Sequence, residues 1–306
     1  MKKKIIVRIA EGLGNQLFMF ANAFALSKKN NFDLLIDNES GFFKKKNRQR
    51  QRKYNLNIFN INFEYTNHNY KFNSYIKDIL RKFYKKFDFF KKKKLFLIEH
   101  KDSNKQTFFK NISLLNTDKK IFVEGHFESE KYFDFCKNEL KNYLSIRSNL
   151  LDNNNKYISL LRTQNSVSIH VRRHRFSEEL KEKKFTSNIK KSENFTKSII
   201  SYINRGVNYF KKNTNNPDFF IWSNDFEGLD QYFNSKEFIF LKNNNNISMD
   251  FHLFSLCKHF IVGASSFHWW GAWLNKNPNK ICIRPSEIHL NPSSNSDFWP
   301  SNWKKI

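Results

Sequence analysis

The chain has 306 residues, a length that suits about two domains of ~100–200 residues each. Hydrophobic residues make up 39% of it and include 35 Phe, so there is ample material for buried cores and global disorder is excluded. The net charge of +26 favours phosphate-bearing partners: nucleic acid, anionic lipid head groups or sugar nucleotides. Three dispersed cysteines without metal-ligand spacing indicate free thiols in a reducing compartment.

The N-terminal residues predict the start of an α/β domain. Residues 5–9 read as a strand, "EGLGNQ" as a glycine turn, "LFMFANAFALSKKN" as a buried helix, and 32–37 as a second strand. The basic start is too short an apolar stretch for a signal sequence, and no window reaches the ~18 apolar residues of a membrane helix. We therefore expect a cytoplasmic protein, with a peripheral membrane contact left open.

The next segment is strongly basic. Residues 41–110 hold 20 Lys or Arg against five acids. Within it, apolar residues recur at three- and four-residue spacing, which predicts a basic amphipathic helix: Ile76, Ile79, Leu80, Phe83, Tyr84, Phe87 and Phe90. Packing of this helix on its own domain is the favoured interpretation, and contact with an anionic membrane is the alternative. Single lysine runs such as 91–94 are typical of solvated surface.

The rest of the chain predicts alternating strands and helices. A strand at 120–125 precedes a helix over 126–144, and an Asn-rich stretch follows as the border between domains 1–155 and 156–306. In the second domain the predicted strands are 166–171, 219–223, 236–241, 259–263 and 280–283, and the predicted helices are 192–211, 226–233, 249–257 and 266–275. This rhythm is that of a doubly wound nucleotide-binding domain.

Ligands of α/β sheets bind beyond the carboxyl ends of the strands, and unusual residues follow several strands here. In the turn after the first strand, Gly12 and Gly14 permit close backbone approach, while Asn15 and Gln16 offer amide hydrogen bonds. This pattern alone is a weak signal, because a purely structural turn explains it equally well.

The stretch "SIHVRRHRF" places a histidine and three arginines at the end of a strand. The guanidinium groups of Arg172 and Arg173 are suited to hold phosphate oxygens, with His170 as a further hydrogen-bonding partner. Since side chains alternate along a strand, one of the two arginines is expected to contact a ligand and the other to be structural. A basic strand end paired with surface acids is the alternative.

Two further strand ends carry polar residues. In "GASSFHWWGAW", Ser265 and Ser266 precede a helix whose free N–H groups can bind an anion, and its tryptophans are expected to belong to the core. In "WSNDF", Asp225 could accept hydrogen bonds from guanine or cap the following helix.

Together these stretches resemble the bacterial galactoside α-1,2-fucosyltransferases of glycosyltransferase family 11. The resemblance rests on "GLGNQLFMFANAFALS", "FVEGHFESEKYF", "SIHVRR", "FFIWSND" and most of all "MDFHLFSLCKHFIVGASSFHWWGAWLN". It extends from about residue 5 to 290 and is weakest over 41–115. It implies a GT-B-like α/β fold of two Rossmann-like domains facing a central cleft. The N-terminal domain would carry the GxGNQ turn, the acceptor side and the basic insert 41–115, and the C-terminal domain would bind GDP-sugar.

The resemblance also implies roles for individual residues. His170 and Arg172 would hold the nucleotide and its β-phosphate, with Arg173 in support, and Asp225 would face guanine. Donor-binding residues would further include Gly14 and the diphosphate cradle of Ser265, Ser266 and the Phe267 backbone. Arg172 would also be catalytic, together with Asn15, which would approach the sugar. No metal or cofactor is implied, since arginine can neutralise the departing GDP.

One motif departs from the family pattern. Where that pattern reads HVRRGD, this chain has His174 and Arg175 in place of Gly and Asp. The change could weaken donor binding, alter the acceptor or mark an inactive homologue. The general base is also open: Glu178 or Glu179 lies at the expected place, and Glu124 and Asp225 are rivals.

The function implied is inverting, metal-independent transfer of L-fucose from GDP-β-L-fucose to a galactoside hydroxyl, in α-1,2 linkage. The expected acceptor is a galactose-containing oligosaccharide or lipid-linked glycan of a surface polysaccharide such as lipopolysaccharide O-antigen or capsule, at the cytoplasmic face of the inner membrane. The alternatives are a related transferase with another GDP-sugar or acceptor, and a non-enzymatic polyanion-binding homologue. Nucleic acid is not the expected partner, because the Arg, His and Ser residues sit at strand ends and not along one basic face.

Overall fold

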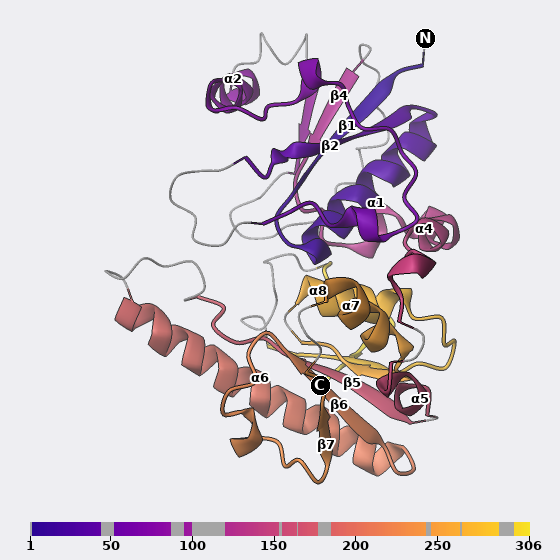
Figure 1. Cartoon of the computed structure of the whole chain (residues 1–306), viewed down its shortest axis with the longest axis vertical. Coiled ribbons are helices and arrows are strands. Elements are labelled where there is room, and N and C mark those ends of the chain that lie inside the picture. The colour runs from indigo at the N-terminus through magenta and orange to yellow at the C-terminus, as the bar shows by residue number, and fades with distance from the viewer. Residues whose placement is uncertain are drawn as a thin grey trace. The chain divides into compact units, whose positions relative to one another are not determined.

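The computed structural model divides the chain into two compact units (Figure 1). Unit 1 comprises Met1–Ser145 with Ser293–Pro300, and unit 2 comprises Ile146–Pro292 with Ser301–Ile306. The structure describes residues 2–43, 52–86, 95–99, 120–152, 155–163, 165–176, 185–242, 246–263, 265–287 and 297–306. The basic insert 41–115 is described over 41–43, 52–86 and 95–99, and its other residues, including the lysine run 91–94, lie outside the described residues.

Unit 1 is built on a parallel four-stranded sheet of order β2-β1-β4-β3. Its strands are β1 (Lys4–Ala10), β2 (Asp33–Gly41), β3 (Leu95–Ile98) and β4 (Lys120–Glu124), and its helices are α1 (Leu13–Asn30), α2 (Tyr75–Lys86) and α4 (Lys137–Tyr143). Helices α1 and α2 lie on opposite sides of the sheet (Figure 1). The buried run over Leu13–Ser27 explains why the α1 sequence is apolar nearly all round.

The helix expected over 126–144 is wrong in its first half. That stretch begins with two 3₁₀ turns, Glu130–Tyr132 and Asp134–Cys136, before α4 starts. The reason is packing: Phe127 has a φ of 53° and, like Phe133, is almost completely buried. The chain bends so that these rings enter the core, where the Phe133 ring lies 6.4 Å from that of Phe18.

Unit 2 holds a six-stranded parallel sheet of order β10-β9-β8-β5-β6-β7. Its strands are β5 (Ser166–Val171), β6 (Asp218–Ser223), β7 (Phe238–Phe240), β8 (His259–Ile261), β9 (Cys282–Arg284) and β10 (Lys304–Lys305), and its helices are α5 (Tyr157–Leu161), α6 (Phe185–Asn213), α7 (Ile247–Leu256) and α8 (Ser266–Leu274). The helix expected over 226–233 is instead a 3₁₀ turn at Leu229–Gln231, which follows Gly228 at a φ of 66°.

The two faces of β5 differ in chemistry, although the whole strand is buried. Val167, Ile169 and Val171 belong to a hydrophobic core that includes residues of α6. The alternate residues Ser168 and His170 meet α7 and α8 instead. One face of this buried strand therefore packs in the core, and the other presents polar side chains that can contribute to a binding site.

The expectations about core residues are confirmed where the structure describes them. Trp269, Trp270 and Trp273 of α8 are buried, as expected for core residues. The three cysteines are free and buried. Among the described residues, no helix is both long enough and apolar enough to span a membrane.

Candidate functional site

The central strand of unit 2 marks a topological switch point. From β5 the chain continues through β6 to β7 on one side of the sheet, and β8, β9 and β10 lie on the other. Ligands of open α/β sheets bind at the carboxyl edge where the order reverses in this way. Arg172 and Arg173 follow β5 directly at this edge, so the basic stretch lies where such a ligand would bind.

His170 is buried at the end of β5 and carries an unbonded ring nitrogen. Its side chain is 8% exposed, and its Nδ1 atom has no hydrogen-bond partner. Burial, aided by the charge of Arg172, lowers its pKa to about 3. At neutral pH it is therefore a neutral imidazole, which can exchange hydrogen bonds with a ligand but adds no positive charge.

A second buried histidine supports the first. The ring of His268, on α8, lies 5.7 Å from the ring of His170, and its Nε2 atom is 3.1 Å from the Ser168 hydroxyl. Burial again holds the pKa of His268 well below its usual value. Sequence analysis missed this residue, although polar residues alternating along a buried strand are a signal for such a partner.

Residues that follow β6 form hydrogen bonds and an ion pair with Arg173. Asn224 forms two reciprocal hydrogen bonds with the backbone of Arg173: its Oδ1 accepts from the Arg173 N–H at 2.8 Å, and its Nδ2 donates to the Arg173 carbonyl at 3.2 Å. The Arg173 guanidinium lies 3.2 Å from the Asp225 carboxylate and also donates to the Glu227 carbonyl. Arg173 therefore matches the structural member of the arginine pair.

Asp225 pairs with the residue that departs from the family pattern. His174 Nε2 lies 2.7 Å from Asp225 Oδ2, and the Glu227 N–H donates to Oδ1 at 3.0 Å. Burial opposes ionisation of Asp225, but the Glu227 N–H, His174 and Arg173 outweigh it and hold its pKa below the usual value. The expected guanine contact stays a prediction, and in this structure the carboxylate is already bonded within the chain.

The backbone explains what His174 replaces. Its φ is 55°, in the left-handed region where glycine is the least strained residue. The neighbouring Arg175, in place of the family's Asp, lies over the Phe195 ring with its guanidinium 4.9 Å from the centroid. His174 therefore adopts a backbone conformation that glycine adopts with less strain, and Arg175 places a cation against α6.

The third part of the edge is the start of α8. Gly263 follows β8, and a Cβ atom there would lie only 2.9 Å from the His170 carbonyl, so glycine lets the two strand ends approach. Ser265 occupies the N-cap position in extended conformation but makes no side-chain capping bond. Phe267 packs between Phe251 and Phe254 of α7 with ring distances of 5.2 and 5.3 Å. The helix N-terminus is thus rigidly held beside β5, as an anion site requires.

The GxGNQ turn lies in unit 1, at the carboxyl edge of its sheet. The fully buried Gln16 side chain donates to the carbonyls of Glu11 at 2.8 Å and Lys53 at 2.7 Å, and accepts from the Asn55 N–H at 2.9 Å. Gln16 therefore holds the turn to residues 53–55. Gly14 is buried and Asn15 half-buried at the same helix start.

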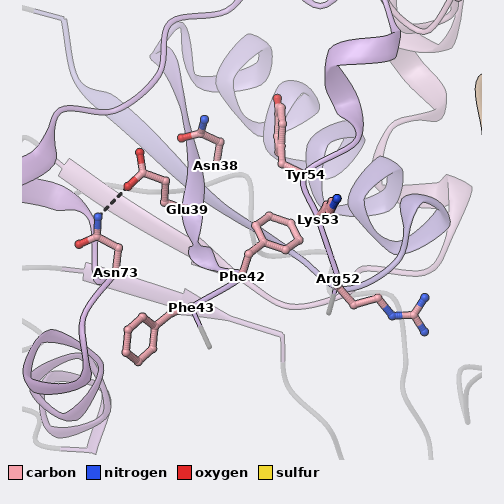
Figure 2. Close-up of a pocket in the computed structure, with 8 residues that line it drawn as sticks. All are labelled: Asn38, Glu39, Phe42, Phe43, Arg52, Lys53, Tyr54 and Asn73. Atoms are coloured by element: carbon pink, nitrogen blue, oxygen red, sulfur yellow. Dashed lines mark hydrogen bonds between the residues drawn. The ribbon is translucent and has the colours of Figure 1, made fainter. Parts of the chain in front are cut away.

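A pocket of about 430 Å³ opens beside this turn (Figure 2). It is lined by Asn38, Glu39, Phe42, Phe43, Arg52, Lys53, Tyr54 and Asn73. Glu39 accepts from Asn73 Nδ2 at 2.6 Å and pairs with Lys71 at 2.5 Å, and these hydrogen bonds lower its pKa. The lining combines aromatic rings and amides with the carboxylate of Glu39 and the cations of Arg52 and Lys53.

The structure describes only some of the candidate general bases. Glu178 and Glu179 lie outside the described residues. Glu124 ends β4 in unit 1, where Arg81 and Lys85 bind it at 2.6 and 2.7 Å. Burial opposes its ionisation, but these cations hold its pKa below the usual value, which makes it a weak base.

Comparison with known proteins fixes the family. The model of glycosyl transferase family 11 matches residues 2–306. The chain belongs to this family. Two relatives from Escherichia coli extend over nearly the same length: an alpha-1,2-colitosyltransferase, 29% identical over 99% of this chain and 98% of the relative, and the O-antigen biosynthesis glycosyltransferase WbnK, 24% identical over 90% and 92%.

The structural comparison concerns the fold. A mutant of Arabidopsis thaliana FUT1 in complex with GDP is 12% identical and has a TM-score of 0.51, covering 94% of this chain and 71% of the other. The family 11 chain is accordingly an α/β protein of GT-B type, as the sequence predicts. It is a glycosyltransferase of this family.

Proposed function

We propose that the chain transfers L-fucose from GDP-β-L-fucose to a galactoside hydroxyl, in α-1,2 linkage and with inversion. The observation that carries the donor part is the meeting of three strand ends in unit 2: Arg172 after β5, Asp225 after β6 and Ser265 after β8. An arginine, a buried histidine and a helix N-terminus at one sheet edge are the donors that a diphosphate needs. The GDP named for the Arabidopsis structure agrees with such a ligand.

The reaction proposed is a direct displacement at the anomeric carbon. The acceptor hydroxyl oxygen forms the new bond while the bond to the GDP oxygen breaks, and negative charge builds on the diphosphate. Arg172 and the N–H groups at the start of α8 stabilise that charge, so no metal is required.

The base that takes the acceptor proton is proposed to be Glu178 or Glu179. Arg81 and Lys85 hold the pKa of Glu124 below its usual value, which disfavours this rival. The Glu227 N–H, His174 and Arg173 lower the pKa of Asp225, which disfavours the other. On the acceptor side, we place a galactose-containing glycan at the pocket of unit 1. The O-antigen named for WbnK supports a surface polysaccharide as the acceptor.

The second candidate is the same reaction with another GDP-sugar. It is favoured by the departure at His174 and by the colitosyl group in the name of the Escherichia coli relative. The donor is therefore the first property to test.

The test is a transfer assay that measures GDP release with a panel of GDP-sugars and galactosides, including the colitosyl donor. Release from GDP-fucose that depends on a galactoside, with an α-1,2 product by NMR, supports the first candidate. Release only with another donor favours the second. No galactoside-dependent release from any donor, with nucleotide still bound, overturns transfer to galactosides.

A further inference from the structure

Helix α2 of unit 1 turns its apolar side outward. Four residues that form one stripe along the helix are exposed: Ile76 by 72%, Ile79 by 50%, Leu80 by 42% and Phe83 by 44%. Tyr75, 72% exposed, extends the stripe at the first turn. Figure 1 shows α2 at the edge of unit 1, on the opposite side of the sheet from α1. The interpretation that this helix packs its apolar side on its own domain is therefore wrong for these residues, and only Tyr84 of the predicted stripe packs against the core among the described positions.

The inward side of α2 is charged. Arg81 binds Asp78 at 2.8 Å within the helix and Glu124 of β4 at 2.6 Å, and all three residues are buried. Lys85 reaches the same Glu124 oxygen at 2.7 Å. An ordinary surface helix has the reverse arrangement, with apolar residues inside and charges in water.

These ion pairs fix the orientation of the helix. Turning the apolar stripe inward would separate Arg81 and Lys85 from Glu124 and leave a buried carboxylate without its cations, which is strongly unfavourable. The exposed stripe is thus held outward by the buried charges and is not a helix that merely failed to pack.

The charges around the stripe identify its partner. Lys82 and Lys86 are exposed on the same helix. Apolar and aromatic side chains flanked by lysines are the pattern of helices that lie in the head-group region of anionic membranes. We propose that α2 is an in-plane membrane contact that binds a surface of anionic phospholipid.

This inference stands apart from the proposed transfer reaction, because it uses no donor or acceptor. It is tested by co-flotation of the full chain with vesicles of phosphatidylcholine containing 30 mol% phosphatidylglycerol, against vesicles of phosphatidylcholine alone. The chain is expected to float with the anionic vesicles at least fivefold more than with the neutral ones, and less as salt is raised.

Two double variants separate the apolar and charged contributions. Ile79→Asn with Phe83→Asn should lower the bound fraction at least fivefold. Its matched control is Phe135→Asn with Leu160→Asn, which removes two apolar residues that are 62% and 44% exposed elsewhere and should leave binding unchanged. Lys82→Glu with Lys86→Glu keeps the stripe and should also reduce flotation, whereas Lys236→Glu should not.

Three results would overturn the proposal. The first is equal flotation with neutral and anionic vesicles, or none with either. The second is unchanged flotation of both α2 variants, each verified as folded by circular dichroism and melting temperature. The third is a dimer, seen by light scattering, that becomes a monomer in the Ile79→Asn, Phe83→Asn variant, because a second copy of the chain would then be the partner of α2.

Discussion

The two units balance their charged side chains differently. In unit 1, Arg81 lies between Asp78 and Glu124, and Lys85 completes the cluster. In unit 2, the arginine stretch after β5 meets Asp225, while the buried His170 keeps a ring nitrogen without a partner. Charges that satisfy one another hold a helix in place. Cations gathered beside an unbonded buried nitrogen and a helix N-terminus indicate a place for an anionic ligand.

The largest expected effect comes from breaking the cluster of unit 1. Glu124→Ala leaves Arg81 and Lys85 without their shared carboxylate and should cost about 3–5 kcal/mol in the free energy of unfolding. Urea denaturation measures it. The control is Glu139→Ala, which removes an exposed pair with Lys28 and should cost at most ~1 kcal/mol. A loss of the same small size at Glu124 would contradict a structural role for the cluster.

The next effect is a pH dependence that arises in unit 2. The pKa of His170 is about 3 in the folded chain, below the ordinary value of 6.5, so the unfolded chain binds the proton more tightly. Its contribution to stability is therefore complete above pH ~6.5 and falls as the pH drops toward 3, by about 2 kcal/mol between pH 6.5 and 5.

The acids of the two units lose their contribution to stability at lower pH than His170. The pKa values of Glu124 and Asp225 are lowered, so their contributions to stability begin to fall only near the ordinary carboxyl pKa of about 4. The pKa of the buried His268 is lowered too, so the test is the difference made by replacing His170 alone. Urea denaturation at pH 7 and pH 5 should show a smaller pH effect in His170→Gln than in the unchanged chain. An identical effect in both would mean that His170 is not held neutral by burial.

Gly263 tests how closely the strand ends of unit 2 approach. A Cβ atom there would lie 2.9 Å from the His170 carbonyl, so Gly263→Ala should cost roughly 1–3 kcal/mol and weaken GDP binding. Gly228→Ala is not a suitable control, because Gly228 has a positive φ that alanine adopts only with strain. The control is Ala272→Gly in the interior of α8, which should weaken the helix by only about 1 kcal/mol without moving the strand ends. If both variants bind GDP with equal affinity, the close approach at Gly263 does not contribute to the nucleotide site.

The smallest effect is expected at His174. Replacing it by Gly relieves a left-handed non-glycine residue but removes the bond to Asp225, so stability should change by less than ~1 kcal/mol. The Asp225 Oδ2 atom, still beside Arg173 but no longer bonded to His174, should then accept from guanine and tighten GDP binding by up to roughly tenfold, the value of one hydrogen bond. Calorimetric titration with GDP measures the change. Weaker binding would show that the His174–Asp225 pair helps to build the site.

Much of the fold and part of the site could be predicted from sequence. Most strands of both sheets follow from short β-rich runs. The strands β3 and β10 were missed, β3 because it is short and embedded in basic sequence and β10 because it is only two lysines long. The edge residues of unit 2 were found because arginines and serines after apolar strands are conspicuous. His268 was not found, and although Asn224 lies at a predicted strand end, its hydrogen bonds to the Arg173 backbone were not predicted. Both residues act through contacts between elements distant in sequence, which no local pattern encodes.

The outward orientation of α2 shows the same limit. Periodicity predicts the apolar stripe but not the side that faces the protein. The orientation depends on Glu124, which binds Arg81 and lies 43 residues beyond it along the chain. A long-range buried ion pair decided it against the usual preference of apolar residues for the interior.

The measurement that tests the central claim most directly is equilibrium binding of GDP to the chain, at low and high salt, with UDP and ATP as competitors and with Arg172→Ala beside the unchanged protein. The edge of unit 2 predicts selective binding of GDP that persists in high salt and is lost at least tenfold in Arg172→Ala, while Arg205→Ala, at an exposed helix position, retains it. Equal, salt-sensitive binding of all three nucleotides, unchanged in Arg172→Ala, would contradict a donor site at this edge and leave the chain as a general binder of polyanions.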